Sequence, residues 1–177
     1  DGISITSDVT SNQLYYTEEC IRKFDSFAKA LPPFREKTDQ DALLQGILTG
    51  SIDCISSGHQ PYSFQDKSKE FDLAPAGTLG LENAFLQIFE KLKLNIKEKL
   101  RLIAKVMSTN PCKIMNLEPI NYKRGTIADF FIFDPNGSSI IQRNYSDLGG
   151  INLPEERREF KGSICQTFVN GKILHNK

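Results

Sequence analysis

The stretch "SIDCISSGHQPYSF", residues 51–64, joins an apolar segment to a polar loop. Its apolar residues indicate a short buried strand over residues 51–56, which ends before Gly58. His59 then begins a loop that also contains a proline and a tyrosine. Ligands of open α/β sheets bind beside the carboxyl ends of the strands, so this junction is typical of an active site. It differs from one in a single respect, because no acidic residue directly follows the strand.

Strand and helix signals alternate on the N-terminal side of this stretch. Residues 3–9 alternate apolar and polar side chains as a strand does. Residues 27–31 can form at most a short strand, because two prolines follow. A short helix with a threonine cap is predicted over residues 17–24. A longer helix begins at Thr38, the first residue of a predicted capping box, and stops at Gly50.

On the C-terminal side, a long polar loop precedes a helical region. The loop covers residues 57–77, and loops of that length in compact domains are usually functional or mobile. Apolar residues then recur at helical spacing over residues 79–92 and again over residues 100–107. A third helix is predicted to begin with Asn110 as its cap and Pro111 in its first turn. The alternation of strands and helices favours parallel βα units.

Beyond residue 117 the sequence is richer in β-forming side chains. Segments 125–135 and 162–176 are predicted as strands. The second segment contains Asn170-Gly171 between apolar residues, which is the strongest short signal for a hairpin. Residues 146–162 show no clear periodicity and are predicted to form a surface loop. A small β-rich part therefore follows the α/β part.

Composition predicts a globular protein without a strongly charged partner. The chain has 177 residues, of which 39% are hydrophobic, enough for a sizeable core. Its 22 lysines and arginines balance 22 aspartates and glutamates, so neither nucleic acid nor an anionic membrane is favoured. No apolar stretch approaches the roughly 20 residues of a membrane span, and we expect a cytoplasmic protein. We place the boundary between an α/β part, 1–118, and a β-rich part, 119–177.

The cysteines give no sign of a metal cluster or a disulfide framework. They lie far apart and form no CxxC pair, and the chain has only two histidines. We expect them to pack as free thiols. The sequence also lacks an initial methionine and opens almost directly into a strand pattern, so we expect a piece of a longer protein. The four residues are Cys20, Cys54, Cys112 and Cys165.

Six segments, taken in order, resemble the C-terminal half of dihydroorotases, which are metal-dependent cyclic amidohydrolases of pyrimidine biosynthesis. They are "DVTSNQLYYT", "FAKALPPFR", "LLQGILTGSIDCISSGHQPYSFQDKSKEFDLAPAGTLGLENAF", "MSTNPCKIMNL", "GTIADFFIFDP" and "VNGKIL". The resemblance covers nearly the whole chain. It implies a (β/α)8 TIM barrel, of which this chain holds the last three strands and helices, followed by part of a small β-sandwich. Active sites of such barrels lie at the carboxyl ends of the strands.

At those strand ends the chain departs from the metal-binding and catalytic residues of the family. Where dihydroorotases read "EVTPHHL", with a histidine that binds zinc, this chain has Asn12 and Gln13. Catalytic zinc takes imidazole, thiolate or carboxylate ligands, and a carboxamide is a poor substitute. The family's "ATDHAPH" supplies an aspartate that binds metal and transfers a proton, and here that position is Gly58. The resemblance therefore implies no bound zinc and no catalytic residue in this chain.

Residues of the family's substrate site are partly kept. Leu31 replaces the asparagine of "KVNPPLR" that contacts substrate, and an apolar side chain cannot make that hydrogen bond. Arg35, His59, Pro75 and Gly77 match the family and form a predicted remnant of the substrate site. A packed or hydrogen-bonded loop histidine explains His59 better than a catalytic role does, and Arg35 is equally explained as a surface charge.

Three functions remain open at this point. The first is a non-catalytic dihydroorotase-like protein that acts as a structural partner, for example of aspartate transcarbamoylase. The second is an active amidohydrolase whose metal ligands lie in the missing N-terminal half. The third is a regulatory module that binds an anionic pyrimidine around Arg35 and His59. In each case the missing half, or self-association, is expected to complete the fold.

Overall fold

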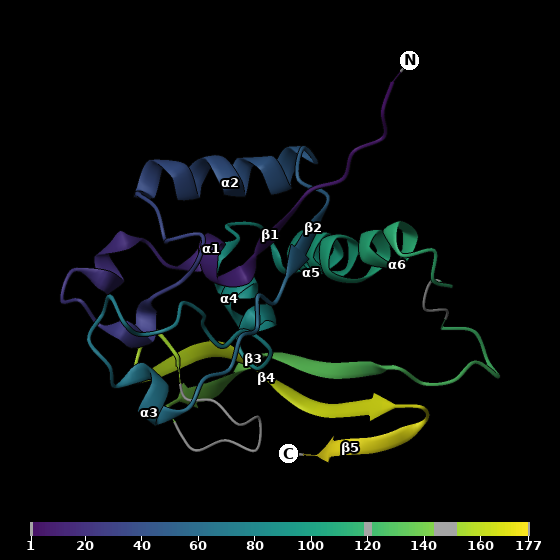
Figure 1. The fold of residues 1–177 in the computed structure, drawn as a ribbon. Helices are drawn as coiled ribbons and strands as arrows, with labels where there is room; N and C mark the ends of the chain where they lie inside the picture. The colour runs from purple at the N-terminus through teal and green to yellow at the C-terminus, as the bar shows by residue number, and fades with distance from the viewer. Residues whose placement is uncertain (1, 119–121, 144–151, 177) are drawn as a thin grey trace.

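The computed structural model describes residues 2–118, 122–143 and 152–176. Helices gather around two short parallel strands, and a three-stranded antiparallel sheet lies below them (Figure 1). Within these ranges, no helix has both the length and the apolar character needed to cross a membrane.

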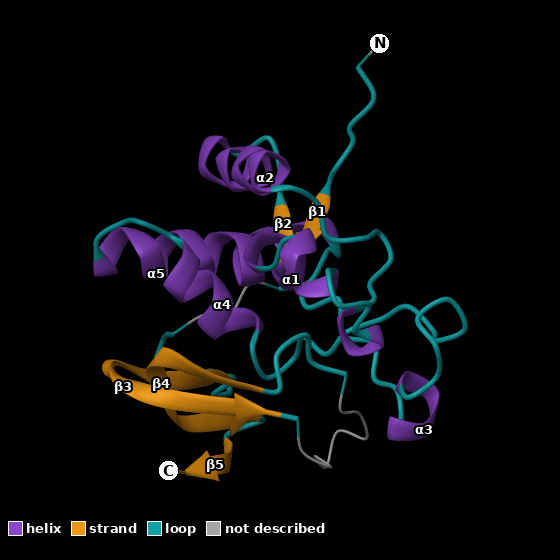
Figure 2. Ribbon diagram, turned by 90° about the vertical axis from the view of Figure 1, so that its left-hand side faces the viewer, coloured by secondary structure: helices purple, strands orange, loops and turns teal. Residues whose placement is uncertain are grey.

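The two parallel strands are enclosed by helices on both sides. β1 (Asp8–Thr10) pairs in parallel with β2 (Cys54–Ser56). In Figure 2, α2 (Lys37–Thr49) lies on one side of these strands, and α4 (Ala84–Lys91) and α5 (Ile96–Ala104) lie on the other. The predicted parallel arrangement of strands and helices is thus present in the described chain.

Apolar side chains from these strands and helices form one core. Removing them from water is the main source of stability, at roughly 25 cal/mol for each Å² of apolar surface buried. The helices predicted over 79–92 and 100–107 correspond to α4 and to α5 with the helical segment that follows it, although α4 starts only at Ala84 and Leu81 is exposed. The buried members of the core are Val9, Leu14, Ile47, Ile55, Ile88, Phe89, Leu92, Ile103 and Val106.

Residues 27–31, which the sequence allows at most a short strand, form none, so the described parallel sheet has two strands rather than the three expected. The Asp25 carboxylate accepts a hydrogen bond from the Phe27 backbone N–H at 2.9 Å. This local bond turns the chain into a 3₁₀ helix, η2 (Ser26–Ala28), instead of an extended segment. The predicted strand over residues 3–9 is also shorter than expected, because only its end, β1, pairs with a neighbour.

The two ends of α2 differ in how well the sequence predicts them. The helix stops at Gly50, whose φ of +83° is the left-handed conformation expected after a helix. Its N-cap is Glu36, which makes no side-chain capping bond, and Thr38 lies inside the helix. The predicted capping box is therefore absent, and the helix starts earlier than the sequence suggests.

Asn110 does not begin a separate helix. A π-helical segment, Lys105–Thr109, joins α5 directly to α6 (Asn110–Ile114), so the chain stays helical through this point. The Asn110 carboxamide instead donates a hydrogen bond to the carbonyl of Asp53, 2.7 Å away and just before β2. The Asn110 side chain therefore makes a tertiary hydrogen bond and does not cap a helix as predicted.

Three short helical segments lie around the strand ends. α1 (Ser11–Tyr15) follows β1 at once, and Thr10 caps it by accepting a hydrogen bond from the Gln13 N–H at 3.2 Å. η1 (Glu18–Ile21) is the observed form of the helix predicted over residues 17–24. α3 (Phe64–Lys67) lies within the long loop after β2.

The C-terminal sheet contains the hairpin that the sequence predicts. β3 (Phe130–Gln142), β4 (Arg157–Val169) and β5 (Lys172–Asn176) are antiparallel, with β4 in the middle. The turn between β4 and β5 is Asn170-Gly171, with φ values of +50° and +74°.

The prediction of a surface loop over residues 146–162 is wrong for its described part. Residues 144–151 lie outside the described ranges. Asn152 and Leu153 are buried, and β4 begins at Arg157 and buries Phe160 to 1% exposure. β3 provides the hydrogen-bonding partner for this segment, and a partner so distant in sequence leaves no local pattern.

An aromatic cluster joins the sheet to the helical part. Phe85 and Phe89 of α4 meet Phe131 and Phe133 of β3. The ring of Phe133 lies edge-to-face against both phenylalanines of α4, at centroid distances of 4.8 and 4.7 Å. The sheet thus packs directly beneath α4, as Figure 1 shows.

Candidate functional site

The carboxyl ends of β1 and β2 lie side by side, because Thr10 pairs with Ser56. The segments that follow them meet around a hollow of about 70 Å³, called here the candidate pocket. Five of the residues predicted for the site line it. They are Asn12, Gln13, Leu31, Gly58 and Gly77.

Gly58 occupies its position for a steric reason. Its φ of +57° lies in the left-handed region, which residues other than glycine rarely adopt. A Cβ placed there would lie 2.7 Å from Cγ2 of Thr10 on the neighbouring strand end. A carboxylate at this position therefore requires both an unfavourable backbone conformation and a displacement of Thr10.

The Asn12 side chain is fully engaged in hydrogen bonds within the protein. Its exposure is 2%, and its Nδ2 donates to Oγ1 of Thr78 at 2.9 Å and to the carbonyl of Leu79 at 2.8 Å. Its Oδ1 accepts a hydrogen bond from Nε2 of Gln87 at 2.9 Å. These bonds tie α1 to α4 and to the end of the long loop, so Asn12 has a structural role in this chain.

Gln13 and Leu31 both border the pocket. Nε2 of Gln13 donates to the carbonyl of Pro32 at 2.7 Å, which joins α1 to the turn around Leu31. The Leu31 side chain is 76% exposed. This wall of the pocket is thus apolar where the family has a hydrogen-bonding residue.

His59 turns toward the backbone of the segment after the long loop. Its Nδ1 accepts hydrogen bonds from the N–H groups of Gly80 at 3.3 Å and of Leu81 at 3.4 Å. The ring borders a separate cavity of about 10 Å³ that Asn83 and Leu153 also line. The geometry favours the interpretation of His59 as a hydrogen-bonded loop histidine.

Arg35 and Pro75 do not line the pocket. Nε of Arg35 pairs with a carboxylate oxygen of Asp39, one helical turn away, at 3.1 Å, and both side chains are largely exposed. Pro75 contributes its carbonyl, which accepts a hydrogen bond from Nζ of Lys67 at 2.9 Å. The structure therefore brings together only part of the predicted remnant of the substrate site.

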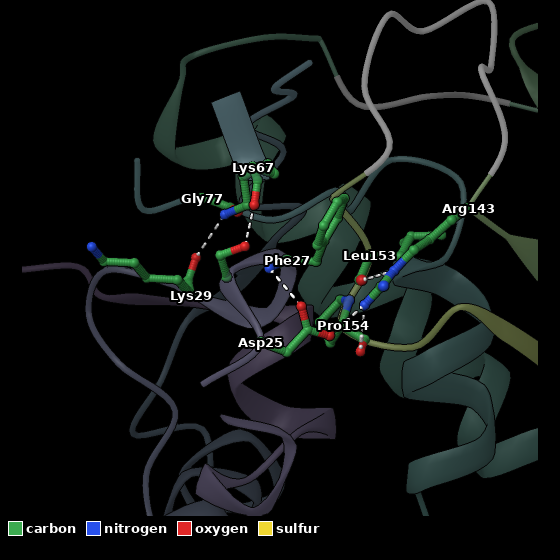
Figure 3. Close-up of polar contacts among 9 residues, drawn as sticks. Asp25, Phe27, Lys29, Lys67, Gly77, Arg143, Leu153 and Pro154 are labelled. Carbon is green, nitrogen blue, oxygen red and sulfur yellow. Dashed lines mark hydrogen bonds and ion pairs between the residues drawn. The ribbon is translucent and has the colours of Figure 1, made fainter. Parts of the chain in front are cut away.

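Lys67 is a buried residue that the sequence analysis missed. Its side chain is fully buried, and Nζ lies 3.2 Å from the carbonyl of Gly77 and 3.5 Å from that of Lys29, a contact visible in Figure 3. Burial, together with the charge of Lys29 nearby, lowers the pKa of the Lys67 ammonium to about 8. A lysine within a polar stretch gives no sign in the sequence that it is buried.

The side chains at the candidate pocket do not fit a zinc ion. The residues that line it include amides, two threonine hydroxyls and apolar groups, but no imidazole, thiol or carboxylate. No cluster of three or more histidine, cysteine, aspartate or glutamate side chains suited to a metal occurs in the described ranges. The residues that bind metal in dihydroorotases therefore have no equivalent among the side chains at this pocket.

Comparison with curated proteins identifies the relatives of the chain. It is 35% identical over 176 residues to dihydroorotase of Thermoanaerobacter sp. (strain X514), a match that covers 99% of this chain. It is 38% identical over 177 residues to dihydroorotase of Carboxydothermus hydrogenoformans (strain ATCC BAA-161 / DSM 6008 / Z-2901). The chain is a homologue of the dihydroorotases. It spans 41% of the length of each of these two relatives, which is consistent with the predicted C-terminal half.

Solved structures place this dihydroorotase homologue in the fold of the cyclic amidohydrolases. A D-hydantoinase (dihydropyrimidinase) from Thermus sp. matches 99% of the chain and 40% of its own length, with a TM-score of 0.83 and 18% identity. An L-hydantoinase (dihydropyrimidinase) from Arthrobacter aurescens matches 97% of the chain and 39% of its own length, with a TM-score of 0.80 and 19% identity. At these identities the likeness concerns the fold alone. No family model matches the chain.

Proposed function

We propose that this dihydroorotase homologue is non-catalytic and acts in pyrimidine metabolism by assembling with another protein. In this proposal the chain forms the last part of a (β/α)8 barrel, over residues 1–118. Residues 119–177 then contribute to a small β-sandwich domain. We place the protein in the cytoplasm.

The observation that carries the proposal is the environment of Gly58. The family has an aspartate at this position that binds metal and moves a proton, and loss of a general base alone costs about 10²–10⁴ in rate. Here the backbone at Gly58 is left-handed, and Thr10 fills the space that a side chain would need. Not only the carboxylate but also the room for it is missing.

The partner we propose is aspartate transcarbamoylase, the preceding enzyme of the pathway, because inactive dihydroorotase-like chains serve it structurally in some bacteria. What supports a structural role is that Asn12 and Gln13 use their polar atoms to join segments of the chain. The test is to mix the full-length protein with aspartate transcarbamoylase of the same organism and to measure the mass of the complex by light scattering. A mass equal to that of the separate proteins at micromolar concentration would contradict this partner.

Catalytic inactivity is tested on the full-length protein by metal analysis and by an assay of dihydroorotate hydrolysis. We expect less than stoichiometric zinc and no turnover. The Gly58→Asp variant should also be inactive, because Leu31 still lacks the hydrogen bond to substrate and Thr10 still crowds the new side chain. Stoichiometric metal together with turnover would instead favour an active amidohydrolase whose ligands lie outside these 177 residues.

The contacts of Arg35 and His59 argue against a regulatory pyrimidine site in this part of the protein. Arg35 is paired with Asp39, and the Nδ1 atom of His59 is occupied by two backbone N–H groups. We therefore expect no heat of binding when orotate is titrated into the full-length protein. Binding that disappears in an Arg35→Ala variant would revive the regulatory function.

A further inference from the structure

The long loop beside the candidate pocket is held at both ends by one asparagine from the C-terminal part of the chain. Asn152 is fully buried, and its Nδ2 donates to the carbonyls of Gln60 at 2.7 Å and of Gly77 at 2.9 Å. Its Oδ1 accepts a hydrogen bond from the N–H of Tyr62 at 2.9 Å. The backbone carbonyl of Asn152 accepts a hydrogen bond from the N–H of Leu79 at 3.1 Å. Two of the four bonds go to residues near the start of the loop, and two go to Gly77 and Leu79 at its end and just beyond it.

The residues that Asn152 holds form a wall of the candidate pocket. Gln60 and Gly77 both line it. The two ends of the loop also meet each other, since the Gln60 N–H donates to the carbonyl of Thr78 at 3.0 Å. A Cβ on Gly77 would lie 2.6 Å from the Tyr62 ring, so the ends are packed without spare room. A shift of either end would therefore change the shape of the pocket.

A second contact supports the same wall from inside the loop. The carbonyl of Gly77 accepts hydrogen bonds from Asn152 and from Nζ of Lys67, at 2.9 and 3.2 Å. Nζ of Lys29 reaches further along the loop and donates to the carbonyls of Phe71 and Ala74, each at 2.8 Å. A buried carbonyl without a hydrogen-bond partner is destabilising, so the two lysines favour the closed loop.

Arg143 fixes the segment that carries Asn152. Its Nε donates to the carbonyl of Leu153 at 2.8 Å and its Nη2 to that of Pro154 at 3.1 Å, as Figure 3 shows. The same Nη2 forms an ion pair with Asp25 at 2.8 Å. The two residues after Asn152 are therefore anchored to the helical part of the chain, which leaves the asparagine little freedom to move.

We propose that Asn152 is a positioning residue for the candidate pocket, which it shapes by clamping both ends of the loop between Gln60 and Leu79. The C-terminal part of the chain thereby controls a wall of a pocket that lies outside it. This role goes beyond the proposed function, because it holds whether the pocket binds a ligand or not.

Amide hydrogen exchange on the full-length protein tests the clamp. Asn152→Ala should raise exchange at Tyr62 by about fivefold or more, because the Tyr62 N–H loses its acceptor and a lost hydrogen bond of about 1 kcal/mol shifts local opening by roughly that factor. Exchange at Gly77 and Leu79 should rise as well, although their N–H groups keep their acceptors, because the two ends of the loop then open more often. Exchange in α2 and α5 should stay unchanged. Asn152→Asp keeps the acceptor for the Tyr62 N–H but sets an oxygen against the carbonyls of Gln60 and Gly77, so exchange at the ends of the loop should rise at least as much as in Asn152→Ala.

Asn176→Ala is the matched control. Asn176 likewise has a hydrogen-bonded side chain, but its Oδ1 accepts from Nε2 of Gln166 at 2.9 Å within the C-terminal sheet instead of bonding to the loop. This variant should leave exchange in the loop unchanged. Unaltered loop exchange in Asn152→Ala, or an equal rise in α2 and α5, would overturn the proposal.

If the Asn152 variants do not fold, exchange of the unmodified protein in mild denaturant decides the question. The amides of Tyr62 and Leu79 should then open together with that of Arg143, which donates to the carbonyl of Glu156 at 2.8 Å. Opening of the loop well before Arg143 would show that the clamp does not hold it.

Discussion

At the scale of a single residue, the surroundings of Gly58 give a steric reason for a glycine at this position, in addition to the loss of the catalytic aspartate. Its φ is +57°, and Cγ2 of Thr10 would lie 2.7 Å from a Cβ. Thr10 cannot move away freely, since its hydroxyl caps α1. The backbone conformation at this strand end, together with the contact with Thr10, therefore favours glycine over any larger residue.

Replacing Gly58 by alanine tests this interpretation. We expect Gly58→Ala to lower the free energy of unfolding by about 1–3 kcal/mol, from the left-handed backbone and the contact with Thr10 together. Gly50→Ala is the matched control, because Gly50 also has a positive φ of +83° but nothing lies within 4 Å of its added Cβ. Denaturant unfolding of both variants gives the difference. Equal losses would show that the contact with Thr10 contributes nothing.

Lys67 makes the stability of the protein depend on pH in the alkaline range. Its pKa is lowered from 10.5 to about 8 by burial, and the charged groups around it are Lys29, Asp25 and Arg143. Between these two pH values the unfolded chain binds more protons at Lys67 than the folded chain, so this lysine makes stability rise with pH. This rise in the free energy of unfolding amounts to at most about 3 kcal/mol.

The measurement is the free energy of unfolding from pH 7 to pH 10.5 in the protein and in Lys67→Met. The pKa of the Cys20 thiol is raised to about 12 by burial, which makes stability fall with pH above about 9. Both proteins share that effect, so their difference isolates Lys67. The free energy of unfolding of the unmodified protein should increase with pH relative to that of Lys67→Met. A difference between the two proteins that stays constant with pH would contradict the lowered pKa of Lys67.

At the scale of elements, α4 connects the two sheets of the molecule. Its buried residues face the core around β1 and β2, and its phenylalanines meet β3. Phe89 belongs to both contacts, since it is 3% exposed in the core and its ring lies 4.7 Å from that of Phe133. The docking of the C-terminal sheet, and with it the position of Asn152, therefore depends on a few aromatic side chains.

Truncation of Phe89 should destabilise the whole molecule. We expect Phe89→Ala to cost about 3–5 kcal/mol, the usual range for removing a buried phenylalanine. Phe131→Ala is the control, because Phe131 also touches Phe85 but is 41% exposed, and it should cost less than about 2 kcal/mol. Thermal and denaturant unfolding measure both, and a similar cost for the two variants would mean that α4 and the sheet are not joined through Phe89.

At the scale of the whole molecule, apolar side chains lie exposed on the C-terminal sheet. Ile173 and Leu174 of β5 are 54% and 68% exposed, and Ile140 of β3 is also exposed. β5 is an edge strand of its sheet, and exposed apolar edges favour pairing with another chain. The 177 residues span only 41% of the length of the relatives that they match, so further chain is one candidate to cover this surface.

We expect the 177 residues, when produced alone, to self-associate. Size-exclusion chromatography with light scattering at micromolar concentration should give a mass above that of a monomer, and Ile173→Lys should shift the distribution toward the monomer. Lys172→Ala, on the same strand, serves as the control and should not reduce association. A monodisperse monomer with cooperative unfolding would contradict both this prediction and the half-barrel assignment.

The sequence alone predicts several elements correctly because their signals are local. The periodicity of α4 and α5, the stop of α2 at Gly50 and the hairpin at Asn170-Gly171 each depend on neighbours within a few residues. The resemblance to dihydroorotases also follows from the sequence, because the order of short motifs survives where single site residues have changed.

The tertiary structure decides what depends on distant partners. The segment around Asn152 looks like a polar surface loop in the sequence, yet β3, Arg143 and the long loop bury it. Lys67 looks solvated, but backbone carbonyls from the loop and from Lys29 surround its ammonium. Hydrogen-bond partners that are far apart in sequence leave no local pattern, so only the folded chain reveals which polar residues hold the candidate pocket in shape.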